Sequence, residues 1–191
     1  AAGRAGVTLA INGRFLTQSV TGVQRFAAEV TQALARAGTP LRLLAPPGAP
    51  DRLGDVPVEI VGTRGGQRWE QLELPRATRG GLLLNLGNTA PLRRRRQVVV
   101  IHDAGVFDTP ESYSLPFRSW YRALHLALPR LGARIVTVSE FSRARLSARL
   151  RLDPAEIAVM PEGVEHAAAG LPEKEVLHAD LQRGHLLQEL I

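Results

Sequence analysis

The sequence lacks cysteine altogether and is poor in lysine and in aromatic residues. Without cysteine, the 191-residue chain can form neither a disulfide nor a thiolate metal site. No apolar run approaches the roughly 20 residues that a membrane-spanning helix requires. The first residues lack a cationic segment followed by an apolar core, so we expect no secretory signal peptide. These absences favour a cytoplasmic protein, with peripheral attachment to the inner face of the cell membrane as an option.

Positive charge is abundant and comes almost wholly from arginine. The net charge is +6 and the isoelectric point is near 11.0, although Lys174 is the only lysine. Such a balance predicts an anionic partner, unless it reflects only the codon usage of a GC-rich genome and a solvated surface. The densest basic cluster is a candidate for contact with an anionic membrane surface: Arg93, Arg94, Arg95 and Arg96. No aromatic residue interleaves with it, so a nucleic-acid partner rests on charge alone, and we expect none.

The most informative pattern is an apolar run that ends in a titratable pair. Residues 98–101 are β-branched and apolar, which predicts a buried strand, and His102 and Asp103 follow at its carboxyl end. Residues 135–138 repeat this pattern and lead through Ser139 directly into a helix. Ligands of open α/β sheets bind in the crevice outside the carboxyl ends of the strands. We therefore expect the polar chemistry of this protein at one edge of a sheet.

Strand and helix patterns alternate along almost the whole chain. The predicted strands cover residues 7–11, 41–44, 56–61, 82–86, 98–101, 135–138 and 157–160. The predicted helices cover residues 23–37, 69–76, 117–131 and 140–150. This alternation predicts an α/β fold with a Rossmann-like, doubly wound and mostly parallel sheet. We expect one such domain over residues 1–166, followed over residues 167–191 by a linker and an amphipathic helix.

Candidate functional residues follow predicted strands or open predicted helices. Gly22 opens the first helix, where free N–H groups favour an anion such as phosphate, unless the glycine serves only the turn. His102 and Asp103 could hydrogen-bond a substrate hydroxyl, or His102 could be a structural residue of the loop. Ser139 is well placed to cap the helix that follows it. Arg143, one turn into that helix, could reach an anion or a sugar.

Several catalytic signatures are absent from the sequence. No G-x-G-x-x-G follows the first predicted strand, and there is no P-loop. No G-x-S-x-G elbow supports a serine hydrolase. The five histidines lack the short-range spacing of metal ligands, so we expect no metal site and no cofactor.

Eight short motifs follow one another along the chain. They are TGVQRF (21–26), WEQLELP (69–75), GNTAP (87–91), VIHD (100–103), PESY (110–113), FRSWYR (117–122), VTVSEFSR (136–143) and MPEGVE (160–165). In this order they resemble the N-terminal domain of the family 4, mannosyltransferase-like glycosyltransferases of GT-B architecture. Each motif alone is weakly specific, whereas the ordered set is specific and covers residues 7 to about 166.

The resemblance implies transfer of a mannose-like hexose from a GDP- or UDP-linked nucleotide-sugar to a glycan or lipid-linked acceptor of a cell-surface polysaccharide. The anomeric configuration would be retained, and this domain would mostly hold the acceptor. His102 and Asp103 would be the catalytic residues, with His102 beside the transferred sugar, whereas Gly22 would meet the donor diphosphate. The acceptor side would be lined by the other polar candidates: Asn12, Arg14, Asn88, Ser139 and Arg143. A front-face reaction of this kind needs no protein nucleophile, so positioning and stabilisation of the leaving diphosphate would supply the rate.

The sequence departs from the family pattern after residue 165. Such enzymes continue into a second Rossmann domain that binds the nucleotide, and residues 167–191 cannot form one. We therefore expect an excised half, a natural remnant or one subunit of a split enzyme, with little or no transferase activity alone. The alternative is a non-catalytic binding or assembly module that inherits His102 and Gly22 without using them.

Overall fold

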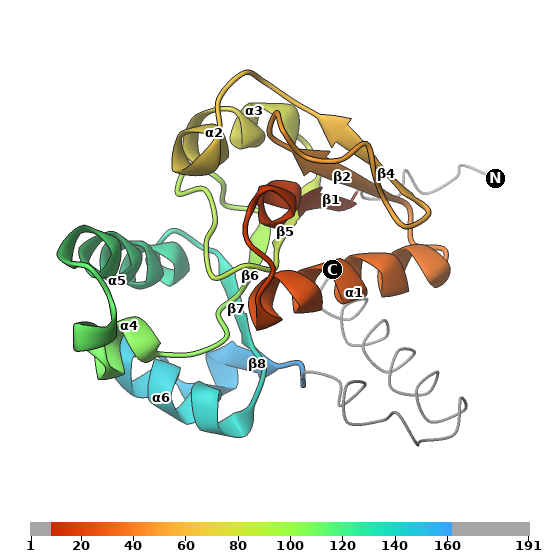
Figure 1. The fold of residues 1–191 in the computed structure, drawn as a ribbon. Coiled ribbons are helices and arrows are strands. Elements are labelled where there is room, and N and C mark those ends of the chain that lie inside the picture. The colour runs from red at the N-terminus through yellow and green to blue at the C-terminus, as the bar shows by residue number, and fades with distance from the viewer. Residues whose placement is uncertain (1–8, 162–191) are drawn as a thin grey trace.

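The computed structural model describes residues 9–161, and within them it contains one eight-stranded sheet (Figure 1). The strands lie in the order β3-β4-β2-β1-β5-β6-β7-β8, and neighbouring strands are parallel except for β3 and β4. The strands are β1 Leu9–Asn12, β2 Leu41–Ala45, β3 Arg52–Leu53, β4 Val56–Ile60, β5 Leu82–Asn85, β6 Gln97–Val100, β7 Arg134–Thr137 and β8 Ile157–Val159. The α-helices are α1 Gly22–Arg36, α2 Gly66–Leu72, α3 Leu74–Ala77, α4 Gly105–Asp108, α5 Leu115–Arg130 and α6 Glu140–Leu150.

Helices cover both faces of the sheet because its strands are apolar on both sides. On β1, Leu9 and Ile11 belong to the core beneath α1, whereas Ala10 packs on the opposite face with Trp69 of α2 and Leu74 of α3. That opposite face also carries α5 and α6, whose apolar side chains pack on β6, β7 and β8. Figure 1 shows α1 separated by the sheet from α2 and α3.

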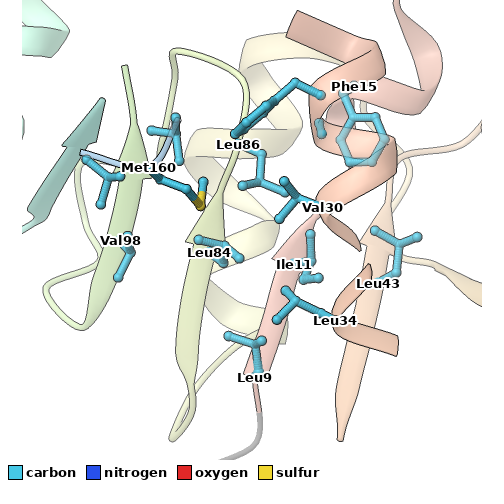
Figure 2. Close-up of a cluster of buried hydrophobic side chains, with 14 of the residues drawn as sticks. Leu9, Ile11, Phe15, Val30, Leu34, Leu43, Leu84, Leu86, Val98 and Met160 are labelled. Carbon is cyan, nitrogen blue, oxygen red and sulfur yellow. The ribbon is translucent and has the colours of Figure 1, made fainter. Parts of the chain in front are cut away.

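The packing of α1 fixes where its first turn lies. Val30 and Leu34 recur at helical spacing, are each 1% exposed, and face Ile11 and Leu84 of the sheet (Figure 2). Burying a side chain of this size contributes about 1.5–3 kcal/mol to stability. Because β1 and β2 are parallel, α1 must run back against them, so its N-terminus lies at the carboxyl edge of β1.

The predicted fold class is confirmed: the sheet is mostly parallel and Rossmann-like, with flanking helices. The predicted helix over residues 69–76 is wrong in one respect, because it is two helices, α2 and α3. Pro75 lacks an N–H and is tolerated only in the first turn of a helix, so a new helix begins beside it. The short β3 and α4 were not predicted. The predicted linker and helix of residues 167–191 lie outside the described residues.

Candidate functional site

The direction of chain connection reverses between β1 and β5, at the middle of the sheet. From β1 the chain passes through α1 to β2 on one side, whereas β5 leads to β6 on the other side. Connections therefore leave in opposite directions, and a crevice opens outside the carboxyl ends of these strands. Asn12 ends β1, Asn85 ends β5, and His102 follows β6. The polar residues that end these strands thus meet at one edge, as the sequence indicates.

His102 is 5% exposed and is held from several directions. Its Nε2 lies 3.0 Å from the carbonyl oxygen of Leu86, and since a carbonyl only accepts, we assign the proton to Nε2. Its ring meets the ring of Phe26 edge-on, with centroids 4.8 Å apart. The backbone N–H of His102 donates to Oδ1 of Asn88 at 2.7 Å. The imidazole is thereby fixed between β5, β6 and the first turns of α1.

Asn88 connects three segments at this edge of the sheet through hydrogen bonds to Val100, His102 and His125. Its φ of 62° lies in the left-handed region, which asparagine adopts more readily than most residues. Its N–H donates to the carbonyl of Val100 at 3.1 Å, and its own carbonyl accepts from Nε2 of His125 at 2.8 Å. Asn88 therefore ties the loop after β5 to the end of β6 and to α5. Its side-chain oxygen already holds the backbone of His102.

His125 was not singled out by the sequence as a residue of this edge. It is 2% exposed on α5, and among the described residues its Nδ1 has no hydrogen-bond partner. Burial lowers the pKa of His125, while the hydrogen bond to Asn88 and the charge of Asp103 oppose that shift. The imidazole is therefore held neutral. In the sequence, His125 lies on the apolar side of a predicted helix. That position is typical of core residues, so it did not mark His125 as a functional residue.

Asp103 is exposed, and its carboxylate accepts from the N–H of Gly105 at 2.7 Å, at the start of α4. Tyr113 lies close by, because a Cβ added to Gly105 would fall 2.7 Å from the Tyr113 hydroxyl and 2.8 Å from Oδ1 of Asp103. Burial, and then the charge of Asp103, raises the pKa of Tyr113. Asp103 is thus a solvent-exposed carboxylate at this edge of the sheet, with the Tyr113 hydroxyl close to it.

An aromatic ladder continues from Tyr113 along α5. The Tyr113 and Phe117 rings stack with centroids 5.4 Å apart, and Phe117 stacks on Tyr121 at 4.2 Å. Tyr121 meets His125 edge-on. Phe117 is 41% exposed, so the ladder offers apolar ring surface to solvent beside the candidate site.

Asn12 and Arg14 meet a buried carboxylate that the sequence did not single out. Glu70 of α2 is 0% exposed, and its Oε1 accepts from Nδ2 of Asn12 at 2.6 Å. Nε of Arg14 lies 3.4 Å from the same oxygen, which makes an ion pair without hydrogen-bond geometry. Thr89 donates to Oε2 of Glu70 at 2.6 Å, and Asn12 also donates to Asn85. We name these five residues the Glu70 network. A cavity of only about 10 Å³ remains beside it.

Gly22 is the first residue of α1, on the same edge as His102. It is exposed, and a Cβ added there would meet nothing within 4 Å among the described residues. The preceding Thr21 donates its N–H to Oε1 of Gln24 at 3.1 Å. Phe26, one turn further, provides the contact with His102. The helix N-terminus and the histidine are thus joined through a single aromatic side chain.

Ser139 and Arg143 lie where β7 passes into α6. Oγ of Ser139 accepts from the N–H of Ser142 at 3.1 Å, so Ser139 caps α6 as the sequence indicates. Arg143 forms an ion pair with Glu140 on the same helix, at 2.5 Å. Its place on the carboxyl edge is as predicted, but its guanidinium is turned toward Glu140.

The arginine cluster at residues 93–96 lies away from this crevice, just before the amino end of β6. Among the described residues, no helix is long and apolar enough to cross a membrane. Within residues 9–161, His, Asp and Glu side chains form no group of three or more that could hold a metal ion.

This combination of a doubly wound parallel sheet and a polar switch point defines the class of Rossmann-like α/β domains that bind ligands at the carboxyl edge. The model of one family, Glycosyltransferase Family 4, matches residues 78–168. The matched stretch runs from β5 through β8 and includes Asn88, His102, Ser139 and Arg143. It supports a family 4 glycosyltransferase-like domain with a general role in glycosyl transfer. No curated protein matches the chain.

Proposed function

We propose that this chain is the acceptor-side half of a retaining glycosyltransferase. It would act on a mannose-like hexose carried by GDP or UDP and on a glycan or lipid-linked acceptor. The observation that carries the proposal is the meeting of Asn88, His102 and Phe26 of α1 at the switch point of the sheet. The family match over residues 78–168 supports glycosyl transfer in general.

In this proposal His102 and Gly22 face the donor. The His102 ring, fixed by Phe26 and Leu86, would hydrogen-bond a hydroxyl of the transferred sugar near the reacting carbon. The positive end of α1 and the N–H groups at Gly22 and Val23 would meet the diphosphate, whereas the N–H of Gln24 belongs to the capping box with Thr21. A front-face retaining reaction forms no bond to the protein. The protein would therefore act by orienting the two substrates and by stabilising charge on the departing diphosphate.

The acceptor would lie over the aromatic ladder. The partly exposed Phe117 ring presents an apolar face that suits the C–H face of a sugar ring. The exposed carboxylate of Asp103 would bind an acceptor hydroxyl. The acceptor would also contact Asn88, Ser139 and Arg143. These contacts would use polar atoms that are not already bonded to His102, Ser142 and Glu140, respectively.

The donor nucleotide would be bound by a second domain or a partner subunit. We propose that the 191 residues alone transfer sugar weakly or not at all.

We also propose that the protein works in the cytoplasm, in contact with the inner face of the membrane. The arginine cluster at residues 93–96 would contribute to this membrane contact. Reversing the charge of Arg93, Arg94, Arg95 and Arg96 together should abolish flotation with anionic vesicles. Flotation that survives this change would refute the membrane contact.

The variant His102→Ala tests the catalytic assignment in the protein as the cell makes it. We expect the rate of hexose transfer to fall about 100-fold, because one positioned donor or acceptor is lost from the transition state. The matched control is His125→Gln, which removes the other buried imidazole of this edge and keeps a donor for Asn88. Its rate should stay within about threefold. Equal rates for His102→Ala and the unmodified protein would refute the assignment.

One observation favours a second candidate, a non-catalytic binding or assembly module. Asn12, Arg14 and Asn88 are already engaged by protein partners, as expected of residues kept for structure. In that case no nucleotide-sugar would be consumed, and His102→Ala would leave partner binding unchanged.

A further inference from the structure

A cavity of about 380 Å³ lies beside the amino ends of β5 and β6, remote from the crevice at His102. Its walls come from α2, α3 and the loop before β6. They consist of Gln71, Leu72, Pro75, Arg76, Arg79, Arg93 and Arg94. Four of these seven residues are arginines, and none is acidic. We name this space the arginine cavity.

The loop that supplies one wall of the arginine cavity is fixed in place. Gln71 of α2 donates to the carbonyl of Ala90 at 3.0 Å and accepts from the N–H of Leu92 at 2.9 Å. Gln97, the first residue of β6, is 2% exposed and donates to the carbonyls of Pro91 and Arg94 in the same loop. Two glutamine side chains thus hold both sides of the loop. The arginines are presented by a rigid frame, which lowers the entropy lost on binding.

The charges of the arginine cavity are not neutralised by the protein. Within residues 9–161, no ion pair involves Arg76, Arg79, Arg93 or Arg94, whereas Arg42, for example, pairs with Glu59 at 2.6 Å. The Arg94 guanidinium donates to the carbonyl of Gly81, and its Nε is buried without a hydrogen-bond partner among the described residues. Burial, and then the charge of Arg96, lowers the pKa of Arg94. Like charges that converge without a counterion raise the free energy of the empty cavity.

We propose that the arginine cavity binds a phosphate group, either of a soluble phosphate ester or of an anionic lipid head group. Guanidinium groups donate in a planar fork that matches phosphate oxygens, and several of them on one anion give charge-assisted hydrogen bonds. The cavity is concave, polar and built on fixed backbone, which distinguishes it from a diffuse basic surface. This site is separate from the crevice, and its occupation does not depend on glycosyl transfer.

A pair of double variants separates this site from general electrostatic attraction. Arg76→Gln with Arg79→Gln removes two charges from the arginine cavity. Arg68→Gln with Arg151→Gln removes the same charge from two exposed arginines that belong neither to the arginine cavity nor to the arginine cluster at residues 93–96. All four side chains are exposed, so both double variants should fold. Far-ultraviolet circular dichroism and thermal unfolding of the full 191-residue chain verify this before binding is measured.

Two probes distinguish the source of the phosphate at 150 mM salt. In one arm inorganic phosphate is titrated while NMR follows the Nε–H signal of Arg94. In the other arm the chain is sedimented with vesicles of phosphatidic acid in phosphatidylcholine. We expect binding in at least one arm, weakened about tenfold or more by the Arg76/Arg79 variant and by less than twofold by the Arg68/Arg151 variant.

Each outcome of this experiment decides the proposal. A selective loss in the inorganic phosphate arm supports the site with a soluble ester as its ligand. A selective loss confined to the vesicle arm supports the site with a lipid head group as its ligand. Equal loss in the two double variants, no loss in either, or no binding of either probe by the unmodified chain overturns the proposal.

Discussion

Glu70 is a fully buried carboxylate at the bottom of the candidate crevice, and Arg14 beside it is 7% exposed. Replacing Glu70 by alanine would leave the Arg14 guanidinium buried without its counter-charge. Breaking a buried pair in this way costs about 3–5 kcal/mol. We therefore expect Glu70→Ala to lower the free energy of unfolding by that amount in urea denaturation. Glu70→Gln should cost less, because its amide oxygen can still accept from Asn12.

The control for this prediction is an exposed ion pair of the same chemistry. Arg42 and Glu59 pair at 2.6 Å on the surface, with side chains that are 42% and 48% exposed. Glu59→Ala should change the free energy of unfolding by less than about 1 kcal/mol, because solvent screens exposed pairs. If Glu59→Ala and Glu70→Ala lowered the free energy of unfolding by similar amounts, the buried ion pair of Glu70 and Arg14 would contribute no more than an exposed one, which would contradict this prediction.

His125 predicts a pH dependence of stability whose sign can be worked out. Its folded-state pKa is depressed below 6.5 by burial, so between that lowered value and 6.5 the unfolded chain binds a proton that the folded chain does not. The contribution of neutral His125 is therefore fully present above pH 6.5 and is lost as the pH falls below it. The loss approaches about 1.4 kcal/mol per pH unit within that window.

The measurement for His125 is urea unfolding at several pH values between 5 and 8. The unmodified chain should lose stability toward pH 5 more steeply than His125→Gln, which carries no titrating group at this position. Parallel curves for the two proteins would contradict a buried, neutral His125.

Residues whose partners are close in sequence could be predicted, and those with remote partners could not. Ser139 bonds to Ser142, three positions away, so its capping role is visible in the sequence. Glu70 bonds to Asn12, 58 positions away, and His125 bonds to Asn88, 37 positions away. Such pairs depend on the fold as a whole. Asn12 and Arg14 were singled out without Glu70, the residue that explains their burial.

At the scale of elements, α5 both builds the core and offers the aromatic ladder to solvent. Leu124 and Leu128 are buried on its inner side, whereas Phe117 near its N-terminus is 41% exposed. We expect Phe117→Ala to raise the KM for the acceptor about five- to tenfold, a loss of roughly 1–1.4 kcal/mol. The kcat should change less than the KM, because the proposed donor contacts at His102 and Gly22 are untouched.

Leu115→Ala is the control for Phe117→Ala, because Leu115 is 65% exposed on the same helix and outside the aromatic ladder. Steady-state kinetics of both variants in the protein as the cell makes it should separate them. An unchanged acceptor KM in Phe117→Ala would exclude the ladder from the acceptor site.

The elements that the sequence predicted well are those with a strong hydrophobic period. α1 and α6 and the main parallel strands agree with the prediction to within about two residues over the described residues. Trp69 and Leu72 suggested one helix through residue 76, but Pro75 requires a first-turn position, and the chain forms α2 and α3 instead. β3 has only two residues and pairs with β4, so it carries no period from which it could be recognised.

At the scale of the whole molecule, the two edges of the sheet differ in chemistry. The carboxyl edge carries buried, hydrogen-bonded polar residues around His102 and Glu70, together with the N-terminus of α1. Beside the amino ends of β5 and β6 lies the arginine cavity, whose charges have no acidic partner among the described residues. The proposed transfer chemistry belongs to the first edge and the proposed phosphate site to the second. A ligand in the crevice at the carboxyl edge and a phosphate in the arginine cavity can therefore be bound at the same time.

The most direct test of glycosyl transfer is NMR observation of the product made by the protein as the cell makes it. The protein is incubated with α-linked GDP- and UDP-hexoses and with glycan and glycolipid acceptors from its own cells. We predict release of nucleoside diphosphate together with a new anomeric signal of an α-glycosidic linkage. A β-linked product would contradict the retaining mechanism. Absence of any transfer from either class of donor would contradict the central claim that this edge serves a glycosyltransferase.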